Sequence, residues 1–137
     1  MMQDTVKTPM AGQSVSEVYA MNIGEKTATR LCARVDMRDN RDCFSGHFPG
    51  VPIFSGVMQL HWVVLLAKQH WYPQGKFSGV SRIKFQCPIL PDDVLDIELT
   101  NATGGKINYW YKCKDRVMSS GSFLLSLDSA EITTAHV

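Results

Sequence analysis

The chain has 137 residues, of which 45% are hydrophobic and 20% charged, and its formal net charge is +1. This length favours a single domain with one sizeable core. The near-neutral charge excludes the broad basic field that nucleic-acid binding requires, and no apolar run approaches the length of a membrane span.

The two ends of the chain differ from its middle. Residues 1–14 are polar and lack the apolar segment of a signal peptide, so we expect a disordered leader on a cytoplasmic protein. A single domain is expected over residues 15–128, followed by a C-terminal tail over residues 129–137.

The four cysteines, Cys32, Cys43, Cys87 and Cys113, are scattered and form no CxxC pair. This pattern argues against a zinc framework and predicts free thiols in the cytoplasm. Cys43 is close to a histidine-containing loop and is interpreted as a small buried hydrophobe, with a nucleophile as the alternative.

Strand-like sequences occupy residues 16–24 and 29–37. In the second of these, apolar residues alternate with Cys, Arg and Asp, which predicts a strand with one solvated face. The charged stretch over residues 38–42 is rich in turn-forming residues and breaks the pattern.

Residues 44–61 read FSGHFPGVPIFSGVMQLH and carry the most information about function. Glycines and prolines surround a histidine, which indicates a rigid loop. An apolar helix follows from about Val57 to His70, with Ser55 and Gly56 in its N-terminal cap region. Since this helix is apolar on nearly all sides, we expect it to be wrapped by a sheet or sealed at an interface.

The second half of the chain is rich in strands. We expect them over residues 79–87, 94–99, 107–114 and 120–127, with a hairpin turn over residues 101–106. One long helix among antiparallel strands is an α+β layout. A sheet curled around the central helix would bury that helix without a second helical layer.

His47 therefore lies on a loop beside a helix N-terminus. Backbone N–H groups at such a terminus have no partner within the helix and can polarise a carbonyl oxygen. An imidazole has an unperturbed pKa near ~6.5, which suits general-base chemistry at neutral pH. The combination indicates acid–base chemistry on an acyl group.

Two segments resemble motifs of the β-hydroxyacyl-acyl-carrier-protein dehydratases, a hot-dog-fold family. Residues 46–57 resemble the active-site loop GHFPxxPxxPGV, with Ser55 where a proline is usual. Residues 83–91 are similar to the motif (I/V)KFxxPxxPGD, with Asp92 in place of the glycine before Asp93. The resemblance covers about residues 15–128, and the QLHWV stretch after the loop looks most like an aryl-polyene-cluster subgroup.

The resemblance implies a homodimer or a higher oligomer, with an acyl tunnel along the dimer interface. Its substrate would be a 3-hydroxyacyl thioester of an acyl-carrier protein or of coenzyme A, dehydrated to the enoyl thioester in fatty-acid or polyene-type lipid biosynthesis. It implies no cofactor and no metal. The residues implied to contact the substrate are Phe48, Pro49, Gly56 and Val57.

In the family the loop histidine, here His47, acts with an acidic residue of the other subunit, fourteen positions later in the sequence. That position is His61 in this chain, and no Asp or Glu occurs from Cys43 to Pro91. His61 is therefore the candidate acid. The alternative is that a carboxylate from elsewhere in the chain serves as the acid, and Asp36, Asp39 and Asp42 are the candidates.

The missing carboxylate leaves two further functions open. One is thioester hydrolysis on the same fold, which the sequence does not favour because many hot-dog hydrolases also use a carboxylate on this helix. The other is a non-catalytic dimer that binds an acyl chain or a carrier protein.

Four basic residues bear on the choice of partner. Arg82 and Lys84 share one face of a predicted strand, and Lys68 and Lys76 are near in sequence. A patch of this kind would steer an acidic carrier protein; an ordinary solvated face is the alternative.

Overall fold

The computed structural model describes residues 9–10, 13–44 and 53–127. Six strands form one antiparallel sheet in the order β1-β2-β4-β5-β6-β3. The strands are β1 (Asn22–Lys26), β2 (Arg30–Asp36), β3 (Lys76–Phe85), β4 (Val94–Asn101), β5 (Lys106–Cys113) and β6 (Arg116–Ser126). The helical elements are α1 (Val15–Val18), α2 (Gly56–His70) and the 3-10 turns η1 (Met37–Phe44) and η2 (Thr103–Gly105).

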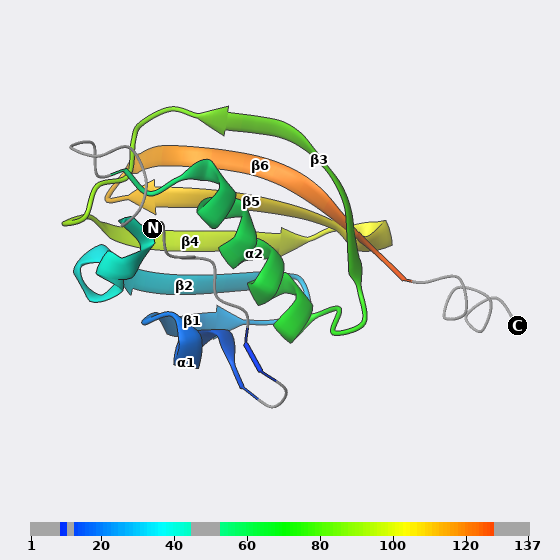
Figure 1. Cartoon of the computed structure of the whole chain (residues 1–137). Coiled ribbons are helices and arrows are strands. Elements are labelled where there is room, and N and C mark those ends of the chain that lie inside the picture. Colours follow the sequence, from blue (N-terminus) through cyan, green and yellow to red (C-terminus); the bar gives the residue numbers. More distant parts are fainter. Residues whose placement is uncertain (1–8, 11–12, 45–52, 128–137) are drawn as a thin grey trace, which may run out of the picture.

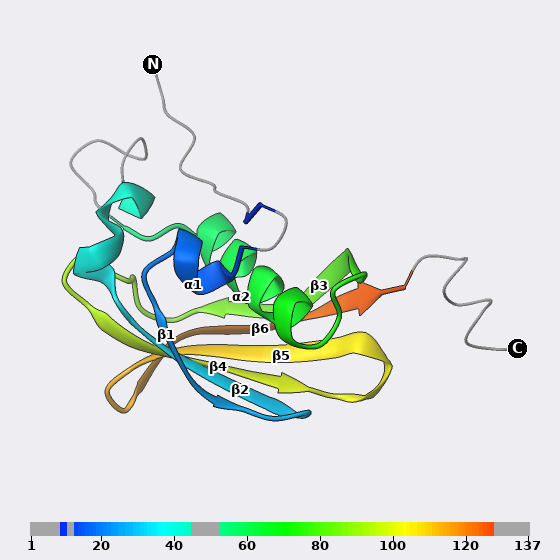
Figure 2. The ribbon, with the colours of Figure 1, turned by 90° about the horizontal axis from the view of Figure 1, so that it is seen from below.

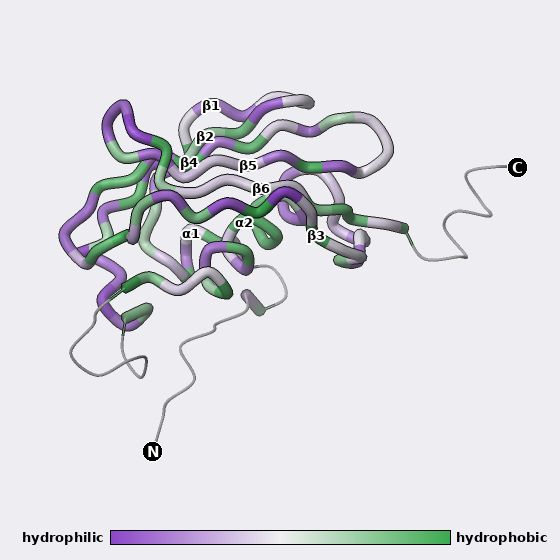
Figure 3. Tube along the Cα trace, turned by 90° about the horizontal axis from the view of Figure 1, so that it is seen from above, coloured by the Kyte–Doolittle hydropathy of each residue, from purple (hydrophilic) through white to green (hydrophobic). Residues whose placement is uncertain are grey.

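The sheet curves around α2, which crosses its concave side, and α1 lies beside α2 (Figures 1 and 2). Hydrophobic and hydrophilic residues alternate along neighbouring strands (Figure 3). On the central strands β4 and β5, every second side chain is buried. These buried positions are Leu95, Ile97, Leu99, Ile107, Tyr109 and Tyr111. The α+β sheet wrapped around one long helix, expected from the sequence, is confirmed.

Local chemistry fixes both ends of α2. At its start, the Ser55 hydroxyl accepts a hydrogen bond from the Met58 backbone N–H at 3.2 Å, as an N-cap does. At its end, the Trp71 indole N–H donates to the Thr27 carbonyl at 2.9 Å, and the Tyr72 hydroxyl donates to Asn101 Oδ1 at 2.9 Å. The helix is therefore joined at its C-terminal end to the β1–β2 turn and to β4.

The sheet buries only one face of α2. The sheet-facing residues Met58, Trp62, Val63, Leu66 and Ala67 are almost inaccessible to solvent. Val57 on the opposite face is 71% exposed, although it is apolar. Of the two ways in which this apolar helix was expected to be covered, wrapping by the sheet accounts for the buried face only.

The predicted strand over residues 16–24 is wrong in its first part. Residues Val15–Val18 form α1 instead, and β1 begins only at Asn22. The Ser14 backbone N–H donates to Glu17 Oε1 at 2.7 Å, which is half of a capping box that stabilises a helix start. The same hydrogen bond lowers the pKa of Glu17.

The strand predicted over residues 79–87 is present with different bounds and is irregular. β3 begins at Lys76, and its pairing with β6 is irregular between Phe77 and Gly79 and between Ser81 and Lys84. At the second irregularity Arg82 has a φ of 56°, which a non-glycine residue rarely adopts. Bulges shift the faces on which side chains lie, so the simple period of two is lost.

Two other segments differ from their sequence-based predictions. β6 begins at Arg116, four residues before the predicted start. The charged break over residues 38–42 belongs to the 3-10 turn η1.

Candidate active site

Three of the predicted site residues, His47, Phe48 and Pro49, lie outside the described residues. Gly56, Val57 and His61 are described, and all three are on α2. The part of the site that can be built is therefore the start of α2 and what surrounds it.

The first turn of α2 presents two backbone N–H groups, at Gly56 and Val57, with no acceptor within the described residues. The next two amides are engaged, because Met58 N–H donates to the Ser55 hydroxyl and Gln59 N–H donates to the Ser55 carbonyl at 3.0 Å. The helix carries no acidic residue in this turn. Two unpaired amides at the positive end of a helix dipole suit an oxygen that acquires negative charge.

Gly56 lies directly against the aromatic ring of Phe85 at the end of β3. A Cβ placed on Gly56 would be 2.6 Å from Phe85 Cζ, which is closer than real contacts allow. Phe85 is 60% exposed, so its ring covers the helix start from the outside. The glycine is therefore needed for this close approach.

His61 is one turn after Val57, on the same face of α2. Its ring is half-buried and lies edge-on to the buried ring of Tyr19, with ring centroids 6.2 Å apart. The imidazole is thus on the outward face of the helix and close to α1. This is the face that the sheet leaves uncovered.

Sequence reasoning missed a buried polar network around Gln59, which is 4% exposed. The Ser119 hydroxyl donates to Gln59 Oε1 at 2.5 Å, and Gln59 Nε2 donates to the Phe54 carbonyl at 3.1 Å. The Tyr111 hydroxyl donates to the Gln59 carbonyl at 2.5 Å. The only sequence signal was an amide side chain among the apolar residues at the start of the helix, because two of its partners, Tyr111 and Ser119, are 52 and 60 residues away.

One of the three alternative carboxylates is engaged in an ion pair. Asp36 accepts from Arg38 Nη2 at 2.6 Å and from Arg38 Nε at 3.0 Å. These hydrogen bonds lower the pKa of Asp36 to about 2, so it is a poor proton donor near neutral pH. Asp39 and Asp42 are exposed on η1.

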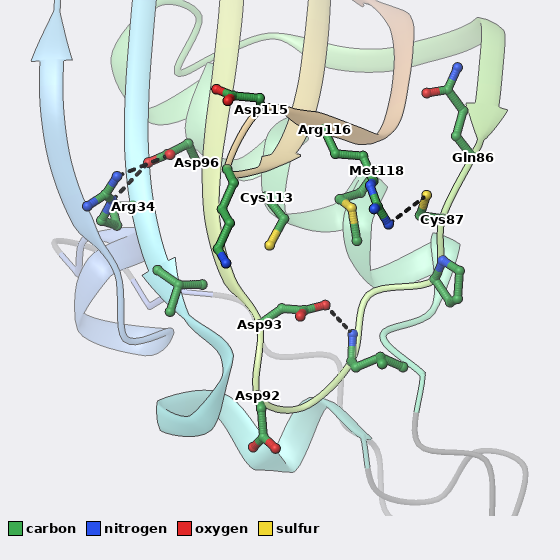
Figure 4. A pocket seen from close by; sticks show the side chains of 14 residues that line it. Arg34, Gln86, Cys87, Asp92, Asp93, Asp96, Cys113, Asp115, Arg116 and Met118 are labelled. Atoms are coloured by element: carbon green, nitrogen blue, oxygen red, sulfur yellow. Dashed lines mark hydrogen bonds and ion pairs between the residues drawn. The ribbon is translucent and has the colours of Figure 1, made fainter.

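A pocket of about 1070 Å³ lies between the β3–β4 connection and the β5–β6 hairpin (Figure 4). Its charges are mixed and partly paired: Arg34 Nε is 2.9 Å from Asp96 Oδ1, and Asp93 Oδ2 accepts from the Leu90 backbone N–H. Among the described residues, no histidine lines it, and neither do Gly56 and Val57. It is therefore separate from the candidate site on α2.

Within the described ranges, no three His, Cys, Asp or Glu side chains are grouped closely enough to hold a metal ion. In the same part of the chain, no helix has both the length and the apolar character needed to cross a membrane. All four cysteines are described, and none forms a disulfide.

Comparison with known proteins gives a consistent result. The family model described as ApeI-like, ApeI dehydratase, matches residues 23–122. The 3-hydroxyacyl-[acyl-carrier-protein] dehydratase FabZ of Haemophilus influenzae is 35% identical over 68 residues, which are 44% of this chain and 46% of that protein. The chain spans about half the length of the curated relatives that it matches.

Two solved structures are similar over most of their length. The dehydratase heterocomplex ApeI:P from Xenorhabdus doucetiae matches with a TM-score of 0.71 and 24% identity, over 77% of this chain and 94% of that chain. An uncharacterised protein from Erwinia carotovora subsp. atroseptica matches with a TM-score of 0.63 and 30% identity, over 77% and 90%. The expected hot-dog fold is confirmed by these matches.

Proposed function

Because the chain belongs to the ApeI-like dehydratase family, we propose that it dehydrates a 3-hydroxyacyl thioester to the 2-enoyl thioester and water. The observation that carries the proposal is the pair of unpaired amides at Gly56 and Val57. They would receive the thioester oxygen while negative charge develops on it.

Each proposed residue has one role in this reaction. His47 removes a proton from the carbon next to the thioester carbonyl, and the electron pair moves onto the carbonyl oxygen. The amides of Gly56 and Val57 stabilise that oxygen. The electron pair then returns from that oxygen to form the carbon–carbon double bond as the bond to the 3-hydroxyl breaks, and His61, as an imidazolium, gives a proton to the departing hydroxyl, which leaves as water.

The substrate is proposed to arrive on an acyl-carrier protein. Arg82 and Lys84 are exposed on β3, next to Phe85, and form no ion pair within the described part of the chain. Unpaired basic residues beside the helix start would attract an acidic carrier. A rate that does not differ between carrier-protein and coenzyme A thioesters would contradict this role.

We propose that the working form is a homodimer. β3 is an edge strand with three exposed hydrophobic side chains, Phe77, Val80 and Phe85, and α2 exposes Val57. Pairing two copies along this edge would cover the uncovered face of α2. His61 of one subunit would then meet the loop of the other. The cytoplasmic location expected from the sequence stays a prediction.

The experiment is to incubate the purified protein with a 3-hydroxyacyl carrier-protein thioester and to measure the enoyl product. We expect turnover by the wild type and a loss of at least about a hundredfold in His47→Ala. Equal rates in the two proteins would eliminate His47 as the base. A thiol-release assay on the same samples separates dehydration from hydrolysis.

A second candidate function is a non-catalytic subunit that binds an acyl-carrier thioester. The observation that favours it is that α2 contains no Asp or Glu. This candidate predicts saturable binding without product, and it predicts that His61→Asp or His61→Glu introduces dehydration into an inert protein. Turnover by the wild type alone would exclude it.

A further inference from the structure

We infer that Gln59, together with Ser119 and Tyr111, is a positioning residue that holds the amides of Gly56 and Val57 where a thioester carbonyl oxygen must lie. The inference rests on the proposed carbonyl site at the start of α2. It assigns a role to a residue that would touch neither substrate nor reacting atoms.

The first step is the number of elements that meet at Gln59. Its side-chain oxygen is bound from β6 by Ser119, and its backbone carbonyl is bound from β5 by Tyr111. Its side-chain nitrogen is bound to the carbonyl of Phe54, two residues before α2 begins. One residue therefore joins two strands, the segment that enters the helix and the first turn itself.

The second step is that folding alone does not require this network. Gln59 is the one polar residue on the buried face of α2, where a leucine of similar length would bury well. A fully satisfied buried polar network contributes mainly orientation, since its hydrogen bonds replace equivalent bonds to water. The feature that such orientation serves here is the pair of amides three and two residues earlier.

The third step is the insensitivity of the network to pH. Burial raises the pKa of Tyr111 well above its ordinary value, so its hydroxyl stays protonated and keeps donating. Serine and glutamine do not ionise. The geometry of the helix start is therefore held constant while the proposed histidines change charge during the reaction.

The chain offers matched controls for both strands. Ser122 is on β6, three residues after Ser119, and is also buried, but its hydroxyl donates to Asn108 Oδ1 at 2.6 Å. Tyr109 is on β5, two residues before Tyr111, is 2% exposed, and makes no hydrogen bond through its hydroxyl within the described residues. Removing these hydroxyls changes the core without touching Gln59.

The test uses the full-length protein and a probe that cannot be dehydrated. Butyryl-pantetheine labelled with ¹³C at the thioester carbonyl has no 3-hydroxyl group, and isotope-edited infrared spectroscopy reports how strongly its carbonyl is polarised when bound. We expect a band shifted to lower frequency in the wild type. The shift should be reduced in Gln59→Leu, Ser119→Ala and Tyr111→Phe, and it should be retained in Ser122→Ala and Tyr109→Phe.

Kinetics give a second readout with 3-hydroxyacyl substrate. We expect kcat to fall by about tenfold to a hundredfold in Gln59→Leu with KM little changed, because a small misplacement of the amides affects the transition state most. Ser119→Ala and Tyr111→Phe keep the test available if Gln59→Leu does not fold.

The outcomes separate this inference from the proposed function. A shifted band in the wild type without any turnover would refute dehydration and leave the positioning role intact. A band equally shifted in the wild type and in the three network variants would overturn the positioning role while dehydration stands. Equal loss in Ser119→Ala and Ser122→Ala would also overturn it, since the effect would then be one of general packing.

Discussion

The two edge strands of the sheet, β1 and β3, differ in length and in the side chains that they expose. β1 has five residues, carries Glu25 and Lys26 among exposed positions, and pairs irregularly with β2 between Ile23 and Lys26. β3 has ten residues and exposes Phe77, Val80 and Phe85. A short, charged and bulged edge resists further pairing, whereas a long edge with exposed apolar side chains favours it.

The residues near the two edges differ in the same way as the edges themselves. Near β1, polar groups find partners within the chain: Arg30 contacts both Glu25 and Glu98, and Asn40 hydrogen-bonds both backbone groups of Ala20. Beside β3 lies the uncovered face of α2 with Val57 exposed. The difference teaches that the polar groups near β1 are satisfied within the single chain, whereas the side beside β3 leaves apolar surface exposed, as the proposed dimer requires.

The largest effect is expected from a charge on the β3 edge. Val80→Lys places an ammonium on a strand that we propose to pair with its own copy, and two-fold symmetry would bring two such charges together. We expect a mass of 15.3 kDa in analytical ultracentrifugation in place of twice that value. Turnover should fall at least about a hundredfold, because the proposed acid–base pair takes His47 from one subunit and His61 from the other.

The matched control on the other edge is Asn22→Lys in β1. It should leave both the mass and the turnover of the wild type. Dissociation of Asn22→Lys, or an intact dimer of Val80→Lys, would contradict the proposal that β3 is the edge that pairs with a second copy.

The next effect concerns stability on the β1 side. Asn40 is 7% exposed, and its side-chain amide accepts from Ala20 N–H at 3.0 Å and donates to the Ala20 carbonyl at 2.9 Å. Asn40→Ala removes both hydrogen bonds, so we expect a loss of about 2 kcal/mol in the free energy of unfolding. Urea denaturation at one fixed protein concentration measures it. An unchanged mass in solution is expected, and dissociation would show that this side also contributes to assembly.

A smaller effect is expected where β3 meets the helix start. Gly56→Ala forces the Phe85 ring to move, and we expect turnover to fall about tenfold because the carbonyl site is disturbed. Stability should change little, since alanine is a better helix former than glycine by about 0.5–1 kcal/mol. Gly24→Ala in β1 is the control, because its Cβ would meet only the Cys32 carbonyl at 3.6 Å. Equal activities of Gly56→Ala and the wild type would show that the close contact between Gly56 and Phe85 has no role in the site.

The smallest effect is a dependence on pH at the end of β2. The pKa of Asp36 falls from 3.8 to about 2 because Arg38 hydrogen-bonds the carboxylate. A carboxyl group whose pKa is lowered by folding stabilises the fold above its unfolded pKa, and this contribution disappears as the pH falls from about 4 to about 2. Thermal melts of the wild type and Asp36→Asn should differ at pH 5 and converge near pH 2. A difference as large at pH 2 as at pH 5 would exclude the ion pair as its cause.

The sequence predicted the elements whose physics is local. α2 was found because an apolar run begins after Ser55 and Gly56, and β2 was found because its side chains alternate regularly. α1 was missed although Ser14 and Glu17 have the spacing of a capping box, since four residues are too few to show helical periodicity. Predictions failed where pairing partners set the structure, as at the bulges of β3.

The candidate site divides in the same way. The helix start at Gly56 and Val57 could be predicted from the sequence, because a capping residue followed by an apolar run is a local feature. His47 lies outside the described residues, so its place in the site stays a prediction. The contact between Gly56 and Phe85 and the hydrogen bonds of Gln59 with Tyr111 and Ser119 join segments 29 to 60 residues apart. Only the folded sheet brings these segments together, so no spacing rule could have found them.

The attachment of α2 at both of its ends limits how the protein can respond to substrates of different size. Trp71 and Tyr72 tie the last turn to neighbouring segments, and Gln59 ties the first turn to β5 and β6. For the proposed acyl thioester, a chain longer by two carbons would then have to find room among individual side chains. Single substitutions along the outward face of the helix should accordingly change the preferred acyl-chain length in discrete steps.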